Sequence, residues 1–423
     1  MAGSHRQTGL NAAGRGWFLE PLLGVLTAVG GYAEVASLST SAQAGAAFGL
    51  RLVWPLILGT VGLILLTEMV GRWASVAGTS YAGAIREHFG FGFYLIPLTA
   101  EVVADTLLLA AELGGMAAGL ALLTGVPLRV GLLIAAAVAW AGVWYLTFPQ
   151  IERGPGLLGL ISLAFVPVIG IALAHPGAHL PLRTLTQVAS VPGGALGRYL
   201  FLCSAVLGAT LSPYLVVFYA SGAREEGWTR DSLRLNRFTA FVGIGFGGVV
   251  GLSVIALSAI VLGPEHADVG TLTQAARILE GPLGTLGRLL FGAILLVCCF
   301  GAALEVCLAV SFDIAQGFGW SWDASAPHST TIRFRLVILV VLAVAIVVGL
   351  IAGDPLMLAL VASAVMALIL PASLGPFLVI MNDRRHLGPH ANGPVGNAVV
   401  VTVLVLAALI SLATIPLLVF GGG

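Results

Sequence analysis

The chain has 423 residues, of which 58% are hydrophobic and only 9% are charged, and its formal net charge is zero. A soluble domain carries about 25% charged residues, so this composition excludes an ordinary soluble enzyme or nucleic-acid-binding domain. Because the chain contains no lysine, it also lacks the phosphate-binding Gly-Lys-Ser/Thr loop of ATP-driven pumps. The composition predicts an all-α polytopic membrane protein and no enzyme.

Eleven apolar segments follow one another with only short connections between them. A helix that crosses a bilayer needs about 20 apolar residues. The predicted spans cover residues 18–48, 52–74, 93–124, 130–148, 156–174, 198–222, 236–263, 284–317, 332–352, 355–381 and 396–420. No separate soluble domain fits, so residues 1–17 are predicted to be an N-terminal segment and residues 18–422 a single transmembrane domain.

The arginines are unevenly distributed between the two sets of loops. If the N-terminus is cytoplasmic, thirteen of the 19 basic residues lie in inner loops, as the positive-inside rule requires. The odd number of spans then places the C-terminus outside. The first apolar run lacks a small-residue cleavage site, so a removed signal peptide is not expected.

The first span has polar and helix-breaking residues at its midpoint. Gly30 and Gly31 precede Glu34, and the hydroxyls of Ser37 and Thr40 follow within two helical turns. Backbone groups freed by a break are costly in hydrocarbon unless they face protein, water or a ligand. This stretch therefore predicts a broken helix beside a cavity.

The sixth span has a second break of the same kind, with Gly208, Ser212 and Pro213 at its midpoint. Proline cannot continue the hydrogen-bond pattern of a helix. Broken helices five spans apart are typical of a 5+5 inverted repeat with its binding site at the membrane midplane. The predicted units are repeat one at 18–175, repeat two at 198–381 and an extra helix at 396–420.

Glu34 is the strongest candidate ligand, because an ionisable side chain at membrane depth is costly and usually functional. The hydroxyls of Ser37, Thr40 and Ser212 could complete an oxygen-only set around a cation. Oxygen ligands suit hard cations such as Mg²⁺ or Mn²⁺. Glu305, in the middle of the eighth span, either lines the cavity or makes a structural hydrogen bond.

Three further acids lie in the third span. Glu101, Asp105 and Glu112 are separated by four and seven residues, which places them on one face of a helix. Such a row inside a bundle is typical of a proton path. The alternative is that Glu101 lies near a helix end and that Asp105 or Glu112 pairs with an arginine. Glu68 and Arg72, four residues apart, predict a local ion pair.

At both breaks the sequence resembles the natural resistance-associated macrophage protein (Nramp) family of divalent metal transporters. Residues 43–49 read Gln-Ala-Gly-Ala-Ala-Phe-Gly and match the segment that follows the family's first motif, which places residues 34–37 in that motif. Residues 212–215, Ser-Pro-Tyr-Leu, occupy the position of the family's Met-Pro-His-Asn. Together with residues 111–118, this pattern looks like a divergent bacterial branch often called Nramp-related.

The resemblance implies a LeuT-type fold in a bacterial cytoplasmic membrane. It also implies that Glu34 replaces the family's metal-binding Asp, Ser37 its Asn and Ser212 its Met, while Tyr214 replaces a His associated with proton movement. The resulting expectation is a secondary transporter that imports a divalent cation, Mn²⁺ or Mg²⁺ in preference to Fe²⁺, by alternating access.

The expected cation ligands are Glu34, Ser37, Ser212 and the carbonyl of Ala209, with Thr40, Tyr214 and Glu305 as candidates for lining the cavity. Glu112, Asp105 and Glu101 are the candidates for proton transfer. The expected partners are the lipid bilayer and the transported ion, with no tightly bound cofactor and no obligatory protein partner. Two alternatives stay open: a transporter of an amino acid or amine, and a membrane sensor or scaffold that keeps the fold without transport.

Overall fold

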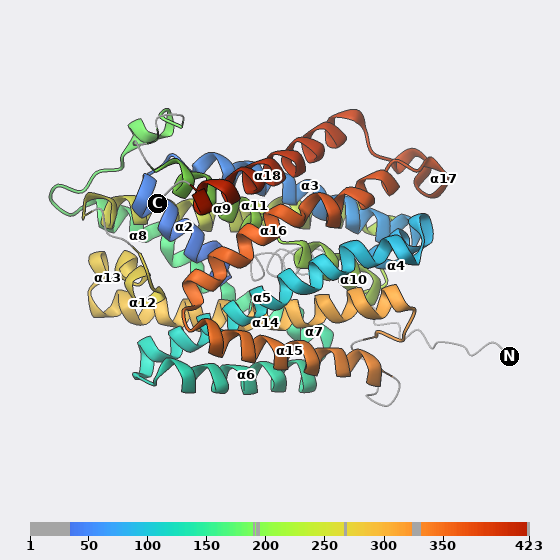
Figure 1. Ribbon diagram of the computed structural model, residues 1–423, viewed down its shortest axis with the longest axis horizontal. Coiled ribbons are helices and arrows are strands. Elements are labelled where there is room, and N and C mark those ends of the chain that lie inside the picture. Colours follow the sequence, from blue (N-terminus) through green and yellow to red (C-terminus); the bar gives the residue numbers. More distant parts are fainter. Residues whose placement is uncertain (1–33, 189–190, 192–194, 266–268, 324–330, 421–423) are drawn as a thin grey trace, which may run out of the picture.

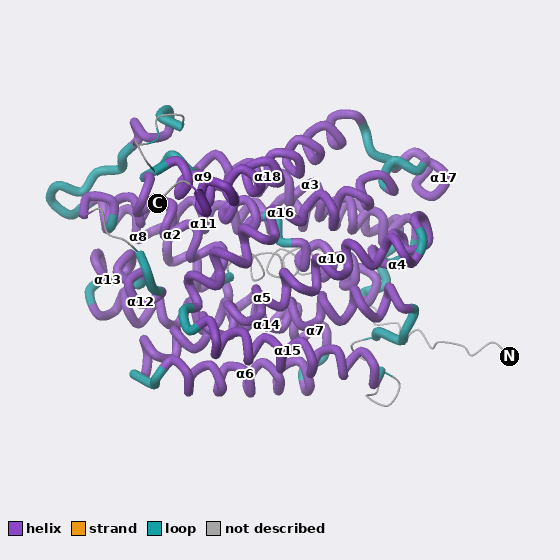
Figure 2. Tube along the Cα trace, viewed as in Figure 1, coloured by secondary structure: helices purple, strands orange, loops and turns teal. Residues whose placement is uncertain are grey.

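The computed structural model describes residues 34–188, 191, 195–265, 269–323 and 331–420. Within these residues the chain is helical and contains no strand (Figure 2). The long helices are α3 (Val53–Ala77), α5 (Phe91–Thr124), α6 (Leu128–Tyr145), α11 (Leu233–Val261), α14 (Thr285–Phe318), α15 (Ile332–Ala352), α16 (Pro355–Ile380) and α18 (Pro394–Phe420). The shorter helices are α2 (Val35–Phe48), α4 (Tyr81–Phe89), α7 (Phe148–Gly159), α8 (Phe165–Leu173), α9 (Leu196–Thr210), α10 (Pro213–Glu225), α12 (Leu272–Ala275), α13 (Arg277–Leu283) and α17 (Arg384–Leu387).

The ten spans predicted after the first are all present as helices long and apolar enough to cross a membrane. Of the first span, only α2 lies within the described residues; Gly30 and Gly31 lie outside them. The predicted start of the fifth span at residue 156 is wrong, because α7 begins at Phe148. Thr147 and Gln150 form a capping box at this start, so a polar turn containing Glu152 belongs to the helix.

The helices α5 and α14 lie between α16 on one side and α15 and α6 on the other (Figure 1). Burial follows this order. In an apolar 18-residue stretch of α14, 78% is buried inside the protein, whereas in the corresponding stretch of α6 39% is buried. The corresponding share is 83% for an apolar 18-residue stretch of the segment made of α9 and α10, and 28% for one in Pro394–Thr414 of α18, at the periphery. Polar side chains of α5, α9, α10 and α14 are therefore shielded from lipid.

Local sequence explains where several helices begin and end. The helix α5 ends at Gly125, whose φ of 75° is left-handed and is readily adopted by glycine. The carboxylate of Asp354 accepts the N–H of Leu356 and caps α16, and Pro355 occupies the first helical position, where no N–H is needed.

Candidate functional site

The break in the sixth span lies at Leu211 and Ser212, between α9 and α10. Leu211 ends α9 and Ser212 has φ −51° and ψ 119°, which is not helical. Pro213 is the first residue of α10, so its missing N–H costs no helical hydrogen bond. The predicted break at Pro213 is thus present.

Gly208 is not part of this break, and that prediction was wrong. It lies within α9, and a Cβ at this position would overlap the backbone carbonyl of Ser363 on α16. The glycine is needed because two helix backbones approach each other closely here. A glycine selected for packing is difficult to distinguish by sequence from one that interrupts a helix.

The helix α2 begins next to this break. Glu34 is its N-cap residue and has an extended backbone with φ −111° and ψ 169°. Its N–H donates to Ser37 Oγ at 3.2 Å, and the Ser37 hydroxyl lies 3.1 Å from the carbonyl oxygen of Glu34. Ser37 therefore contributes to the start of the helix, and Thr40, one turn later, donates to the Ser37 carbonyl.

The Glu34 carboxylate lies between the start of α2 and the break between α9 and α10, and the residue is 1% exposed. Tyr214 donates its hydroxyl proton to Glu34 Oε2 at 2.7 Å. The Ser212 hydroxyl lies 3.2 Å from Glu34 Oε1 and 3.1 Å from the carbonyl oxygen of Ala209, and its single proton serves one acceptor at a time. The structure thus brings Glu34, Ser212, Ala209 and Tyr214 together.

Glu112 of α5 also lies at the start of α2. Both of its oxygens accept the backbone N–H of Val35, at 3.1 and 3.3 Å. Negative charge is favourable at a helix N-terminus, where backbone N–H groups lack helical partners. Two acids, Glu34 and Glu112, therefore meet at this helix start, and both are buried.

The other two acids of α5 lie apart from Glu112. The hydroxyl of Tyr81 is 3.3 Å from Glu101 Oε1, and Glu101 is hydrogen-bonded to Asp313 of α14. Asp105 interacts electrostatically with both Asp313 and Glu34, and its Oδ1 has no hydrogen-bond partner although it is buried. Asp105 thus links Glu101 electrostatically to Glu34, which in turn interacts with Glu112.

Sequence reasoning missed Asp313. Tyr94 donates to Asp313 Oδ1 at 2.7 Å, and the residue is 2% exposed. The available signal was its distance of eight residues from Glu305 on the same predicted helix, which places both acids on similar faces. Glu305 is also buried, and it interacts electrostatically with Glu34.

Among the described residues, no three Asp, Glu, His or Cys side chains converge closely enough to hold a metal ion by themselves. A cation at Glu34 would need hydroxyl, carbonyl or water oxygens as its remaining ligands. Hard cations accept such a set, and Mg²⁺ is commonly held by one or two carboxylates plus water. The oxygen atoms around Glu34 and Ser212 fit this requirement.

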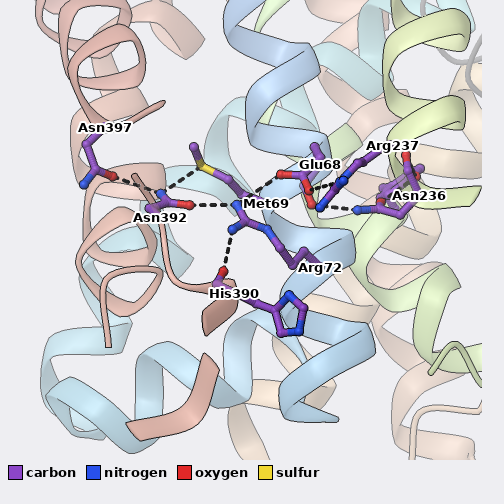
Figure 3. Close-up of polar contacts among 9 residues, drawn as sticks. Glu68, Met69, Arg72, Asn236, Arg237, His390, Asn392 and Asn397 are labelled. Atoms are coloured by element: carbon purple, nitrogen blue, oxygen red, sulfur yellow. Dashed lines mark hydrogen bonds and ion pairs between the residues drawn. The ribbon is translucent and has the colours of Figure 1, made fainter. Parts of the chain in front are cut away.

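Glu68 and Arg72 form the predicted ion pair at 3.0 Å, in the C-terminal half of α3 (Figure 3). Arg72 also donates to the carbonyl of His390 at 2.5 Å and to Asn392 Oδ1 at 2.7 Å. Arg237 of α11 lies 3.8 Å from Glu68. This network joins α3 and α11 to the segment before α18 and contributes no ligand to the breaks.

Asp383 lies near the same end of the molecule, outside the membrane spans. Its carboxylate accepts the N–H of Arg385 at 2.8 Å and caps α17. This hydrogen bond, together with that to His386, lowers the pKa of Asp383. This charged segment therefore starts a short helix.

A family model described as "Natural resistance-associated macrophage protein-like" matches residues 24–417. A divalent metal cation transporter MntH of Aeromonas hydrophila is 26% identical over 87% of this chain and 88% of its own length. One of Deinococcus radiodurans is 26% identical over 84% of this chain and 80% of its own.

Two solved structures extend the comparison to the fold. A mutant of the Eremococcus coleocola manganese transporter superposes with a TM-score of 0.77 at 16% identity, covering 99% of this chain and 91% of that one. A nucleobase-cation-symport-1 family transporter superposes with a TM-score of 0.60 at 15% identity, covering 93% and 91%. The predicted all-α LeuT-type fold is confirmed.

Proposed function

The chain belongs to the Nramp family, and from this premise we propose that it is a secondary transporter that imports a divalent metal cation across a bacterial cytoplasmic membrane. The relatives named above are transporters of divalent metal cations, and none is an enzyme. The observation that carries the proposal to this chain is the buried carboxylate of Glu34, which lies between the start of α2 and the break in the sixth span and is surrounded by oxygen atoms.

The ligands we propose are the Glu34 carboxylate, the Ser212 hydroxyl and the Ala209 carbonyl, with Ser37 adjacent and Thr40 and Tyr214 lining the site. Sulfur and imidazole, which favour softer transition metals, are missing from this set. The proposed order of preference therefore places Mn²⁺ and Mg²⁺ above Fe²⁺. Since Tyr214 occupies one oxygen of Glu34, a bound cation would take the other oxygen or displace the tyrosine proton donor.

An amino acid is a poorer fit to the same site. In transporters of this fold, the carboxylate of such a substrate binds the free N–H groups of a broken helix. Here the N–H of Val35 is already bound to Glu112, and Glu34 adds a second negative charge beside it. A substrate carboxylate would be repelled by both acids, whereas a cation would be attracted.

Alternating access would proceed by movement of repeat one (18–175) against repeat two (198–381), with the extra helix (396–420) outside this motion. We place the N-terminus inside and the C-terminus outside, following the arginine distribution. Proton coupling is part of the proposal, and Asp105, Glu101 and Glu112 are its candidate carriers on α5. The bilayer and the transported ion are the only partners proposed.

The test is uptake of Mn²⁺, Mg²⁺ and Fe²⁺ into proteoliposomes, with internal pH recorded at the same time. Glu34→Gln should abolish uptake, because the neutral amide keeps the shape of the side chain but loses the charge that binds the cation. Glu87→Gln, at an exposed position of α4, is the matched control and should transport as the parent does. Absence of metal uptake by a folded parent protein would contradict the metal proposal. An uptake screen with amino acids and amines would then distinguish a transporter of such solutes from the sensor or scaffold alternative.

A further inference from the structure

Two buried carboxyl oxygens without hydrogen-bond partners lie on facing helices beyond Glu34. They are Oε1 of Glu305 on α14 and Oε2 of Glu152 on α7. Glu305 is 1% exposed, and Glu152 is half-buried. A buried carboxylate is costly unless it is paired with a positive charge. A cation passing between the two helices would supply such a charge.

The packing of α7 against α14 places these two acids opposite each other. A Cβ at Gly301 of α14 would lie 2.7 Å from the Cβ of Pro155 on α7, so the two helices are in contact there. Glu305 follows Gly301 by four residues, and Glu152 precedes Pro155 by three, which keeps each acid on the contacting face. The helices run in opposite directions, so both acids are displaced toward the same end of the contact.

The acids form a row from the helix breaks to the surface. Glu305 interacts electrostatically with both Glu34 and Glu152. The carboxyl group of Glu152 is hydrogen-bonded to that of Glu226, which follows the end of α10. The side chain of Glu226 is 29% exposed, and one of its oxygens lies 3.7 Å from Arg153. Exposure therefore increases along the row.

Other titratable groups face the row from neighbouring helices. Tyr214 of α10 lies within electrostatic range of Glu305, and Tyr219 of the same helix within range of Glu152. Arg153, at the surface end, is the only basic side chain among the contacts described for these acids. The inner part of the row thus consists of acids with no basic side chain among the contacts described for them.

We propose that Glu305, Glu152 and Glu226 form an acidic path along which the transported divalent cation passes between Glu34 and the cytoplasmic end of α10. Two hydrogen-bonded carboxyl groups share a proton. A divalent cation arriving at Glu152 and Glu226 would bind one oxygen of each, and the shared proton would leave to the solvent. Within the described residues, no third acid joins Glu152 and Glu226 closely enough to hold a metal ion. Two carboxylates alone bind a divalent cation weakly, which suits passage of the ion rather than its storage.

This inference rests on the proposed transport of a divalent cation. Its test distinguishes failure of the acidic path from failure of the proposed transport. Mn²⁺ uptake into proteoliposomes is measured for the parent, Glu305→Gln and Glu152→Gln, and Mn²⁺ binding is measured by titration in detergent. Each substitution should lower the maximal uptake rate about tenfold, the size expected when a permeating ion loses one charge partner. Binding at Glu34 should be retained in both variants, with the smaller change in Glu152→Gln, because neither acid is a ligand there and Glu305 interacts electrostatically with Glu34.

The charge-conserving variant Glu305→Asp and the exposed control Glu87→Gln should both retain uptake, which excludes a general folding defect as the cause. Parent-like uptake by both Gln variants would overturn the path while leaving the proposed function intact. Loss of proton movement with unchanged Mn²⁺ uptake would also overturn it, because the acids would then carry protons only. A parent that moves no metal would instead contradict the proposed function.

Discussion

The carboxylate of Glu112 accepts the backbone N–H of Val35, a residue 77 positions earlier in the chain, and so helps to start the helix that follows Glu34. A residue that the sequence indicated as a proton carrier is thus also part of the framework of the cation site. Its two roles can be separated by substitution, since a neutral acceptor can keep the hydrogen bond without the charge.

We expect Glu112→Gln to keep the fold, because its amide oxygen can still accept the Val35 N–H. Glu112→Leu leaves that N–H buried without a partner, which costs about 1–3 kcal/mol. Thermal unfolding in detergent should show a lower Tm for the Leu variant than for the Gln variant. Equal Tm values for the two would show that the hydrogen bond contributes nothing to stability.

Tyr214→Phe removes the hydroxyl that donates to Glu34 Oε2 and leaves the ring in place. Loss of a group that orients a metal ligand typically weakens metal binding about 10- to 100-fold. Titration with Mn²⁺ should therefore give a Kd that is raised at least about tenfold. Tyr81→Phe, a buried tyrosine that contacts Glu101 instead, is the matched control. An unchanged Kd for Mn²⁺ in Tyr214→Phe would show that the Tyr214 hydroxyl does not contribute to the cation site.

Added Mn²⁺ should stabilise the folded protein if Glu34 binds it. At a free concentration 100 times Kd, binding to the folded state alone contributes about 2.7 kcal/mol. Tm should rise with Mn²⁺ in the parent and remain constant in Glu34→Gln, and a chelator should reverse the rise. A similar rise in both proteins would place the stabilising ion elsewhere.

Arg72→Ala should destabilise the end of α3, because Arg72 is 12% exposed and binds Glu68, His390 and Asn392. Removal of one partner of a largely buried charge network leaves the other groups unpaired, at a cost of several kcal/mol. The control Arg237→Ala should change stability by less than about 1 kcal/mol, since that side chain is 66% exposed and 3.8 Å from Glu68. Urea unfolding of both variants measures the difference.

Gly208→Ala should lower the free energy of unfolding by about 1–3 kcal/mol, the usual cost of inserting a methyl group into a packed contact. The new Cβ would overlap the Ser363 carbonyl, which is backbone and cannot rotate away. Gly245→Ala on α11 has no atom within 4 Å of its new Cβ and should be neutral or slightly stabilising, because alanine favours helix. Equal effects at both glycines would contradict the close packing of α9 on α16.

The sequence by itself determined the class of protein, ten of its spans and the break at Pro213. These features depend on local properties: the length of an apolar run against the thickness of a bilayer, and the inability of proline to donate a hydrogen bond. The sequence also singled out Glu34, because a carboxylate at mid-span is exceptional whatever surrounds it. The resemblance at residues 43–49 indicated the family to which the chain belongs.

Only the tertiary structure decided which groups meet. The hydrogen bonds of Glu34 to Ser212 and Tyr214 join residues about 180 positions apart, and their formation depends on how the helices rotate and cross. For the same reason, the sequence could not separate Glu112 at the helix start from Glu101 beside Asp313, or place Glu152 opposite Glu305. Helical periodicity shows which residues share a face, but not which neighbouring helix that face contacts.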